Sequence, residues 1–219
     1  MNQSNTFWNF FNDEAAPQLA YREKTFRQIF EYLDQIDGPI SIIETGCARL
    51  AGNWAGDGQS TVMFDKYINA RDEQSICYTV DINPASVAEC IKLVSPRVKV
   101  AQDDSVHYLH GLAKVFKNKD QCISMAYLDS FDLDMIYWQP SAIHHLKELL
   151  ALRPCMNEQT LVVIDDCPLN ANFLTSGNNS LQILGNASVG GKGRLVAEYA
   201  QAIGAKIVFA EYQAGWTGF

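Results

Sequence analysis

The 219-residue chain lacks several features that would place a protein in a class at once. It has no apolar run of about 18 residues, so we expect no membrane-spanning helix. Its first eleven residues lack the basic start and apolar core of a signal peptide. Lys and Arg number 17 against 25 Asp and Glu, a net charge of −8, and no basic cluster is present. This balance disfavours nucleic acid and anionic membranes as partners.

The cysteines also lack the spacing of a metal-binding motif. None of the six cysteines belongs to a Cys-x-x-Cys pair, which disfavours a structural zinc site. We interpret them as buried free thiols and expect the protein to be cytoplasmic.

What the sequence does contain is a regular alternation of short apolar runs and helical patterns. Hydrophobic residues make up 47% and charged residues 19%, as in an ordinary folded globule. A helix over 18–36 is followed by predicted strands and helices in turn. The strands are 40–44, 76–80, 98–101, 123–128, 161–164 and 206–210, with the tail to 219 as a seventh. The helices between them are 60–69, 84–93, 106–116, 141–152 and 194–203.

This order predicts an α/β fold. We expect a doubly wound, seven-stranded, mostly parallel sheet with helices on both faces and an antiparallel last strand. Residues 1–37 form an N-terminal aromatic segment and helix, and residues 38–219 form the main domain. The aromatic run 7–11 is interpreted as a core staple or a dimer contact, with a substrate lid as the alternative.

Acidic residues follow the predicted strands. In parallel sheets ligands bind outside the carboxyl ends of the strands, so these side chains are expected to share one edge. Gly46, directly after the first strand, permits a tight turn and close approach of a ligand. The G-x-G-x-x-G spacing of a pyrophosphate cradle is incomplete, which disfavours a dinucleotide-dependent oxidoreductase. Asp81, ending the second strand, is placed to accept hydrogen bonds from both hydroxyls of a ribose.

Glu44-Thr45-Gly46 and Asp81 together resemble two motifs of the class I S-adenosylmethionine-dependent methyltransferases. The resemblance runs from about residue 40 to the end of the chain and implies S-adenosyl-L-methionine as cofactor. It implies that Ser60 or Thr61 holds the methionyl carboxylate of the cofactor at a helix start, and that Asp103 and Ser105 lie beside the adenine.

A second group of carboxylates follows the fourth and fifth strands: Asp129, Asp165 and Asp166. Three carboxylates converging without basic partners repel one another, and a hard divalent cation relieves the repulsion. The alternative is that they cap loops or face solvent. Their spacing resembles the metal-dependent O-methyltransferases of the catechol and macrocin types, which implies that these three residues hold Mg²⁺. The lysine base of the catechol type is replaced by Asp132.

Without that lysine, His144 and His145 are the candidate bases, with Asp129 beside them. A histidine titrates near neutral pH and can take a proton from a hydroxyl. Adjacent helical residues point about 100° apart, so we expect at most one of the two to face the site.

Two stretches near the C-terminus are rich in polar residues or glycine. Residues 167–190 are interpreted as a long polar loop that frames the acceptor. The run Gly190-Gly191-Lys192-Gly193-Arg194 lacks the strand and spacing of a phosphate loop, and we interpret it as a flexible lead into the following helix.

We therefore expect methyl transfer to the hydroxyl of a small molecule, a sugar or natural product, assisted by a divalent metal. The alternatives are a metal-free methyltransferase with another acceptor and a non-catalytic cofactor-binding protein of the same fold. No nucleic acid or membrane partner is expected, and a homo-oligomer remains open.

Overall fold

The computed structural model describes residues 3–175 and 181–219, with the exception of the side chains at 3–5, 57, 171–175 and 181–186. In the described part of the chain, no helix combines the length and the apolar character needed to cross a membrane.

A seven-stranded sheet forms the centre of the molecule. Its strand order is β3-β2-β1-β4-β5-β9-β8. The first five strands are parallel, and β9 runs antiparallel to both β5 and β8. The strands are β1 Ser41–Thr45, β2 Ile76–Asp81, β3 Val98–Gln102, β4 Met125–Leu128, β5 Leu161–Ile164, β8 Lys206–Ala210 and β9 Ala214–Thr217. The predicted fold class is confirmed, including the antiparallel last strand.

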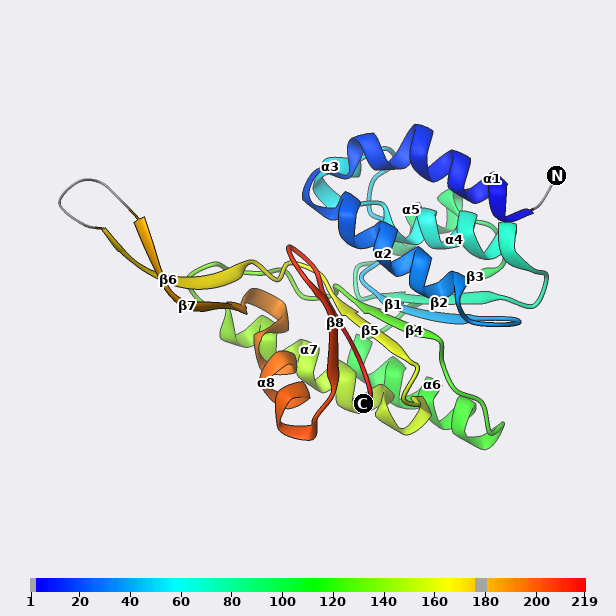
Figure 1. Cartoon of the computed structure of the whole chain (residues 1–219). Helices are drawn as coiled ribbons and strands as arrows, with labels where there is room; N and C mark the ends of the chain where they lie inside the picture. The colour runs from blue at the N-terminus through cyan, green and yellow to red at the C-terminus, as the bar shows by residue number, and fades with distance from the viewer. Residues whose placement is uncertain (1–2, 176–180) are drawn as a thin grey trace.

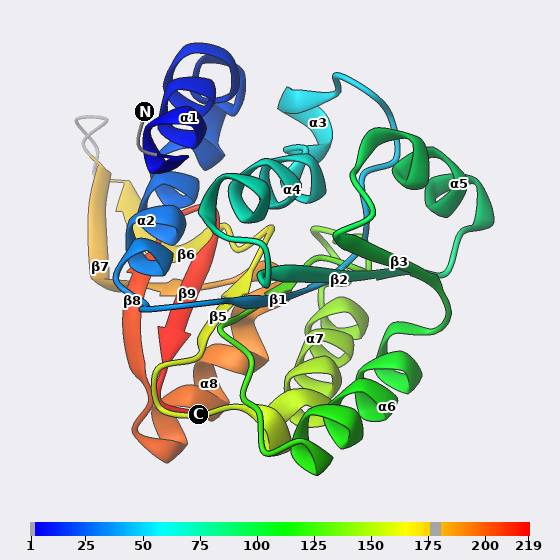
Figure 2. The same cartoon turned by 90° about the vertical axis from the view of Figure 1, so that its right-hand side faces the viewer.

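Helices cover both faces of the sheet (Figure 2). On one face lie α1 Gln3–Phe10, α2 Glu23–Asp34, α4 Ser60–Arg71 and α5 Pro84–Leu93, with the short α3 Trp54–Asp57 at the edge. On the other lie α6 Ser105–Asn118, α7 Gln139–Leu152 and α8 Arg194–Ile203. Both α5 and α8 have the predicted bounds. Asn83 caps α5 by accepting from the Ala85 N–H, and Gly204 ends α8 in the left-handed region at φ +78°.

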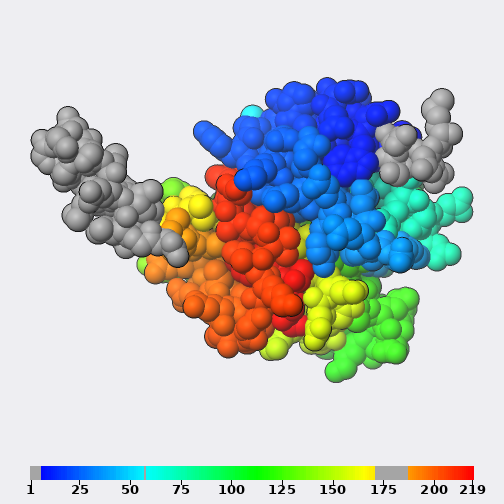
Figure 3. Space-filling model, in the orientation of Figure 1, coloured from blue at the N-terminus to red at the C-terminus, as the bar shows by residue number. Residues whose placement is uncertain are grey.

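The aromatic N-terminal segment is part of the core. Phe7 and Phe11 are buried, and the Phe7 ring packs edge-on against Phe30, with centroids 4.5 Å apart. Figure 3 shows the lighter blue part of the N-terminal segment lying against the red C-terminal strands. This packing brings the turn before α2 beside the carboxyl ends of β4 and β5.

Two sequence predictions need correction. The helix predicted over 18–36 begins only at Glu23, because Ala20 takes a positive φ of 49° and two 3-10 turns, Ala16–Gln18 and Ala20–Arg22, precede it. The polar loop predicted at 167–190 contains instead a two-stranded antiparallel hairpin, β6 Leu169–Thr175 and β7 Leu181–Val189. The hairpin extends away from the sheet (Figure 1). Its pairing comes from backbone hydrogen bonds, to which side-chain polarity is a poor guide.

Candidate functional site

The turn after β1 is fixed by a close backbone crossing. Gly46 has φ +79°, and its N–H donates to the Val80 carbonyl at 2.9 Å. A Cβ on Gly46 would lie 2.5 Å from the Asp129 carbonyl oxygen. Only glycine fits here, so the loop after β1 runs directly between the ends of β2 and β4.

Glu44 stabilises this loop through hydrogen bonds. Its carboxylate is fully buried and accepts from Ser60 Oγ at 2.6 Å and Thr61 Oγ1 at 2.7 Å. The Thr61 hydroxyl oxygen also accepts from the Ala48 N–H at 2.9 Å. Burial raises the pKa of Glu44 to about 7, although the hydroxyl donors oppose the shift. Both hydroxyls that the resemblance assigned to the cofactor are therefore committed to Glu44, while Ser60 still lines the adjoining pocket.

Asp81 lies between two pockets at the carboxyl edge of the sheet. The smaller, about 40 Å³, is lined by Gly46, Cys47, Ala48, Arg49, Ser60, Asp81, Asp129, Ser130 and Asp132. The larger, about 310 Å³, is lined by Val80, Asp81, Ile82, Asp104, Ser105, Ser130, Phe131 and His144. Asp81 and Ser130 belong to both, so one elongated molecule lying across them would contact both side chains.

The Asp81 carboxylate retains acceptor capacity. One oxygen accepts from the Asn83 N–H at 2.8 Å and the other from the Cys47 N–H at 3.4 Å. Within residues 3–175 and 181–219, no Lys or Arg is ion-paired with Asp81. A carboxylate has about four acceptor positions, so a diol can be bound here.

The two residues assigned to the adenine region have different surroundings. Ser105 lines the larger pocket, and its hydroxyl lies 2.9 Å from His144 Nε2. Asp103 lies outside this pocket: its carboxylate pairs with His107 Nδ1 at 2.8 Å and borders a surface hollow along α6. The neighbouring Asp104, which caps α6 through the His107 N–H, is the acidic residue that lines the larger pocket.

The two candidate bases also differ. His144 lines the larger pocket, and its Nε2 lies 3.3 Å from Glu148 Oε1. His145 is fully buried and donates from Nδ1 to the Ser141 carbonyl at 2.8 Å. Burial lowers the pKa of His145 to about 4, so this ring is neutral at physiological pH.

Glu148 is a site residue that the sequence analysis missed. It is fully buried on α7 and accepts from Thr45 Oγ1 at 3.1 Å and from Ser130 Oγ at 2.5 Å. Burial acts to raise the pKa of Glu148, but the hydrogen bonds and nearby imidazoles outweigh it and leave the pKa lowered. The spacing of four residues between His144 and Glu148 was the available signal, since such pairs lie on one helix face.

The structure brings Asp129, Asp165 and Asp166 together, as predicted, but with two cations between them. Arg22 Nε lies 2.8 Å and 3.1 Å from the two oxygens of Asp165, and Arg22 Nη2 lies 3.2 Å from Asp166 Oδ1. Lys192 Nζ contacts Asp129 and lies 2.9 Å from Asp166 Oδ2. The expectation that these carboxylates converge without basic partners is wrong, because Arg22 and Lys192 come from distant parts of the chain.

Two tyrosines complete this carboxylate cluster. Tyr127 donates to Asp165 at 2.9 Å and Tyr212 donates to Asp166 at 2.5 Å. Burial opposes a charged ammonium at Lys192, but Asp129 and Asp166 outweigh it and raise its pKa above the usual value. Across the described part of the chain, no set of three or more His, Cys, Asp or Glu side chains is arranged to hold a metal ion. The donor set therefore does not fit the Mg²⁺ that the resemblance implied.

Comparisons with known proteins give fold-level likenesses. No protein-family profile and no curated protein sequence matches the chain. Among solved structures, the MycE methyltransferase from the mycinamycin biosynthetic pathway, in complex with Mg and SAH, is similar over 66% of this chain, with 18% identity and a TM-score of 0.44. This chain covers 31% of the length of the MycE chain.

Two further solved structures are similar over most of their length. The match to the DhpI–SAH complex covers 98% of this chain and 94% of the DhpI chain, with 12% identity and a TM-score of 0.48. The match to the glycopeptide N-methyltransferase MtfA, complexed with S-adenosyl-L-methionine, covers 93% of this chain and 94% of the MtfA chain, with 8% identity and a TM-score of 0.45. With TM-scores below 0.5, these likenesses do not bear on what this chain binds or does.

Proposed function

We propose that this protein is an S-adenosylmethionine-dependent methyltransferase that acts on the hydroxyl of a small molecule. The observation that carries the proposal is Asp81, a carboxylate with spare acceptor capacity between two pockets at the carboxyl edge of a parallel sheet. Gly46, in the turn beside it, lines the smaller pocket.

The proposed cofactor spans both pockets. The ribose hydroxyls bind Asp81, and the adenine occupies the larger pocket, between Ile82 and Ser105. The methionyl end enters the smaller pocket near Ser60. When bound, the cofactor supplies an electrophilic methyl group on sulfonium, and the residues of this chain orient it and the acceptor.

His144 is the proposed base. It lines the larger pocket and is held by Glu148 on its own helix, as a base is held by an orienting carboxylate. It would take the hydroxyl proton of an acceptor that enters beside Ser130, which lines both pockets, as the methyl group is transferred. A nitrogen acceptor is the alternative, and the proposal includes no metal step because Arg22 and Lys192 pair with the carboxylates expected to bind one.

Calorimetry with S-adenosylhomocysteine tests the cofactor assignment. We expect one site per chain, and Asp81→Ala should weaken binding by about 1–3 kcal/mol, the cost of losing hydrogen bonds to a charged acceptor. Asp37→Ala, an exposed carboxylate in the turn before β1, is the matched control and should bind as the wild type does. Absence of binding to the wild type would refute the proposal, and unchanged affinity in Asp81→Ala would refute the ribose assignment.

A panel of hydroxylated small molecules with labelled cofactor tests the base. With an accepted substrate, His144→Ala should slow turnover by about 10²–10⁴-fold at saturating cofactor. His110→Ala, at an exposed position of α6, is the control. Full activity in His144→Ala would remove His144 from the mechanism, and labelling of amines alone would replace the hydroxyl by nitrogen.

A further inference from the structure

The carboxylate cluster at the ends of β4 and β5 has most of its acceptor capacity in use. Both oxygens of Asp165 accept from Arg22, and each has a second donor, the Asp166 N–H at 2.8 Å or the Tyr127 hydroxyl at 2.9 Å. Asp166 accepts from Arg22 and Tyr212 at one oxygen and from Lys192 at the other. By the same count of about four acceptor positions, Asp165 has all of them in use and Asp166 has three, so a metal ion bound to Asp165 would have to displace a donor.

The backbone around Lys192 is shaped to deliver its ammonium to this cluster. Lys192 is only 1% exposed, although lysine is almost never fully buried without partners. Its N–H donates to the Asp166 carbonyl at 3.1 Å, which ties the segment to the end of β5. The Gly190-Gly191-Lys192-Gly193 run is therefore a fixed element, where a flexible lead was expected.

The flanking glycines are needed for this approach. A Cβ on Gly191, where φ is +53°, would lie 2.2 Å from the Asp166 carbonyl oxygen. A Cβ on Gly193 would lie 2.5 Å from Cys167 Sγ. Side chains at either position would push the segment away from β5 and withdraw Lys192 from the carboxylates.

The Lys192 ammonium supplies the positive charge that a metal ion would otherwise bring to the carboxylate cluster. Its ammonium touches Asp129 and Asp166, which come from the ends of two neighbouring strands. With Arg22 it reduces the formal charge of the three carboxylates from −3 to −1. Asp129 also lines the smaller pocket, whereas Lys192 is not among the described residues that line it. Lys192 therefore acts on that pocket only through Asp129.

We propose that Lys192 is a built-in cation of the carboxylate cluster: it holds Asp129 against the smaller pocket and closes the cluster to divalent metal ions. Lys192 is thus a positioning residue. The statement about cations holds whether or not the chain binds S-adenosylmethionine. Its consequence, methyl transfer that a chelator does not inhibit, rests on the proposed function.

Binding of Mn²⁺, followed by the electron paramagnetic resonance signal of the free ion, tests the proposal on the whole chain. The wild type should show no stoichiometric Mn²⁺ site. Lys192→Met removes the ammonium but keeps most of the side-chain length, and should create a site that binds Mn²⁺ at least about tenfold more tightly than the wild type. The melting temperature of this variant should rise with Mn²⁺ concentration, because the ion binds the folded state.

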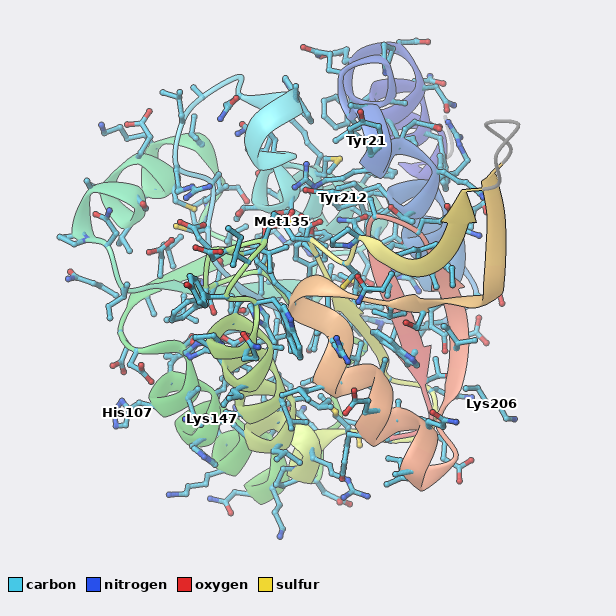
Figure 4. All side chains as sticks on the ribbon, turned by 90° about the vertical axis from the view of Figure 1, so that its left-hand side faces the viewer. Tyr21, His107, Met135, Lys147, Lys206 and Tyr212 are labelled. Carbon is cyan, nitrogen blue, oxygen red and sulfur yellow. The ribbon has the colours of Figure 1, made fainter. Side chains whose placement is uncertain are left out.

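Two variants separate charge from general disturbance. Lys192→Arg keeps the positive charge and should remain closed to Mn²⁺. Lys206→Met, on β8, removes an exposed lysine that points into solvent away from Tyr212 (Figure 4) and should behave as the wild type. A gain of Mn²⁺ binding in Lys192→Met alone supports the proposal.

Other outcomes overturn it. Stoichiometric Mn²⁺ binding by the wild type that Asp129→Asn abolishes would show that the cluster is a metal site after all. A folded Lys192→Met that gains no Mn²⁺ site would show that Lys192 does not stand in for a metal. If Lys192→Met does not fold, the wild type, Asp129→Asn and Lys192→Arg still decide the question. Calorimetry with S-adenosylhomocysteine reports separately on the proposed function.

Discussion

Two halves of the same sheet edge use acidic residues in different ways. At the β1–β2 end, Asp81 accepts two backbone N–H groups and lies open to two pockets. At the β4–β5 end, Asp165 is fully buried and paired with Arg22. The first carboxylate can bind a ligand without losing a partner in the protein, whereas the second cannot.

The difference shows that an acid at a strand end does not reveal its own role. In the sequence both positions look alike, since each follows an apolar strand in a parallel sheet. What separates them is the arrival of cations from far along the chain: Arg22 lies 143 residues from Asp165, and Lys192 lies 63 residues from Asp129.

The largest expected loss of stability follows a substitution at the β4–β5 end. Arg22→Ala leaves Asp165 buried without its cation, and removing one partner of a buried ion pair costs about 3–5 kcal/mol. Urea unfolding should show this loss in the free energy of unfolding. Arg27→Ala, on α2, removes a half-exposed pair with Glu23, a hydrogen bond to Asn12 and a stacking contact with Phe11, and should cost about 1–2 kcal/mol, less than Arg22→Ala.

Equal losses in Arg22→Ala and Arg27→Ala would contradict the view that the β4–β5 carboxylates depend on a buried cation.

The stability of the folded state should depend on pH through Glu44, which lies at the β1–β2 end of the sheet edge. Burial raises the pKa of Glu44 in the folded state from 4.5 to about 7, so the folded state holds the proton more tightly than the unfolded state. This contribution to stability is full below about pH 4.5, falls as the pH rises to about 7, and is gone above that. The change is on the order of 3 kcal/mol.

Glu44→Gln removes this ionisation and keeps one acceptor oxygen, which serves the hydroxyl of Ser60 or that of Thr61. The free energy of unfolding of the wild type, minus that of Glu44→Gln, should therefore fall between about pH 4.5 and about pH 7. A difference that stays constant, or rises with pH, would show that Glu44 is not destabilised as an anion.

The smallest expected effect is the difference in stability between alanine variants of two glycines that have almost equal φ. Gly38 has φ +77°, and a Cβ added to it would meet no heavy atom within 4 Å, so Gly38→Ala adds only backbone strain, about 1–2 kcal/mol. Gly46→Ala adds the same strain and an overlap with the Asp129 carbonyl, roughly 1–3 kcal/mol more. Thermal unfolding measures the difference between the two variants.

Calorimetry adds a second contrast, because only Gly46→Ala should also weaken S-adenosylhomocysteine binding. Two variants of equal stability and equal affinity would mean that the crossing of the β1 loop over β4 does not shape the site.

Local signals in the sequence were sufficient for much of the fold. Apolar runs located the parallel strands, and Asn83-Pro84 and Gly204 marked helix ends, since capping depends on neighbouring residues. The hairpin β6–β7 was missed because the Asn and Ser residues of 167–190 were given more weight than the apolar residues between them.

The site was predictable to the extent that strand ends define it. Asp81, Gly46 and Ser105 line the pockets, and their positions follow from the sheet alone. Arg22, Lys192 and Glu148 were not assigned, because their roles depend on tertiary contacts. Asp103 was one residue away from Asp104, the acid that lines the larger pocket, because a one-residue shift at a helix start changes which side chain faces the cavity.

The central claim is that the Asp81 end binds the cofactor while the β4–β5 end needs no metal. Its most direct test is calorimetric titration of the wild type with S-adenosylhomocysteine, once in Mg²⁺ and once in excess chelator. We predict one site per chain and the same dissociation constant in both. No binding in either buffer, or binding that requires Mg²⁺, would contradict the account.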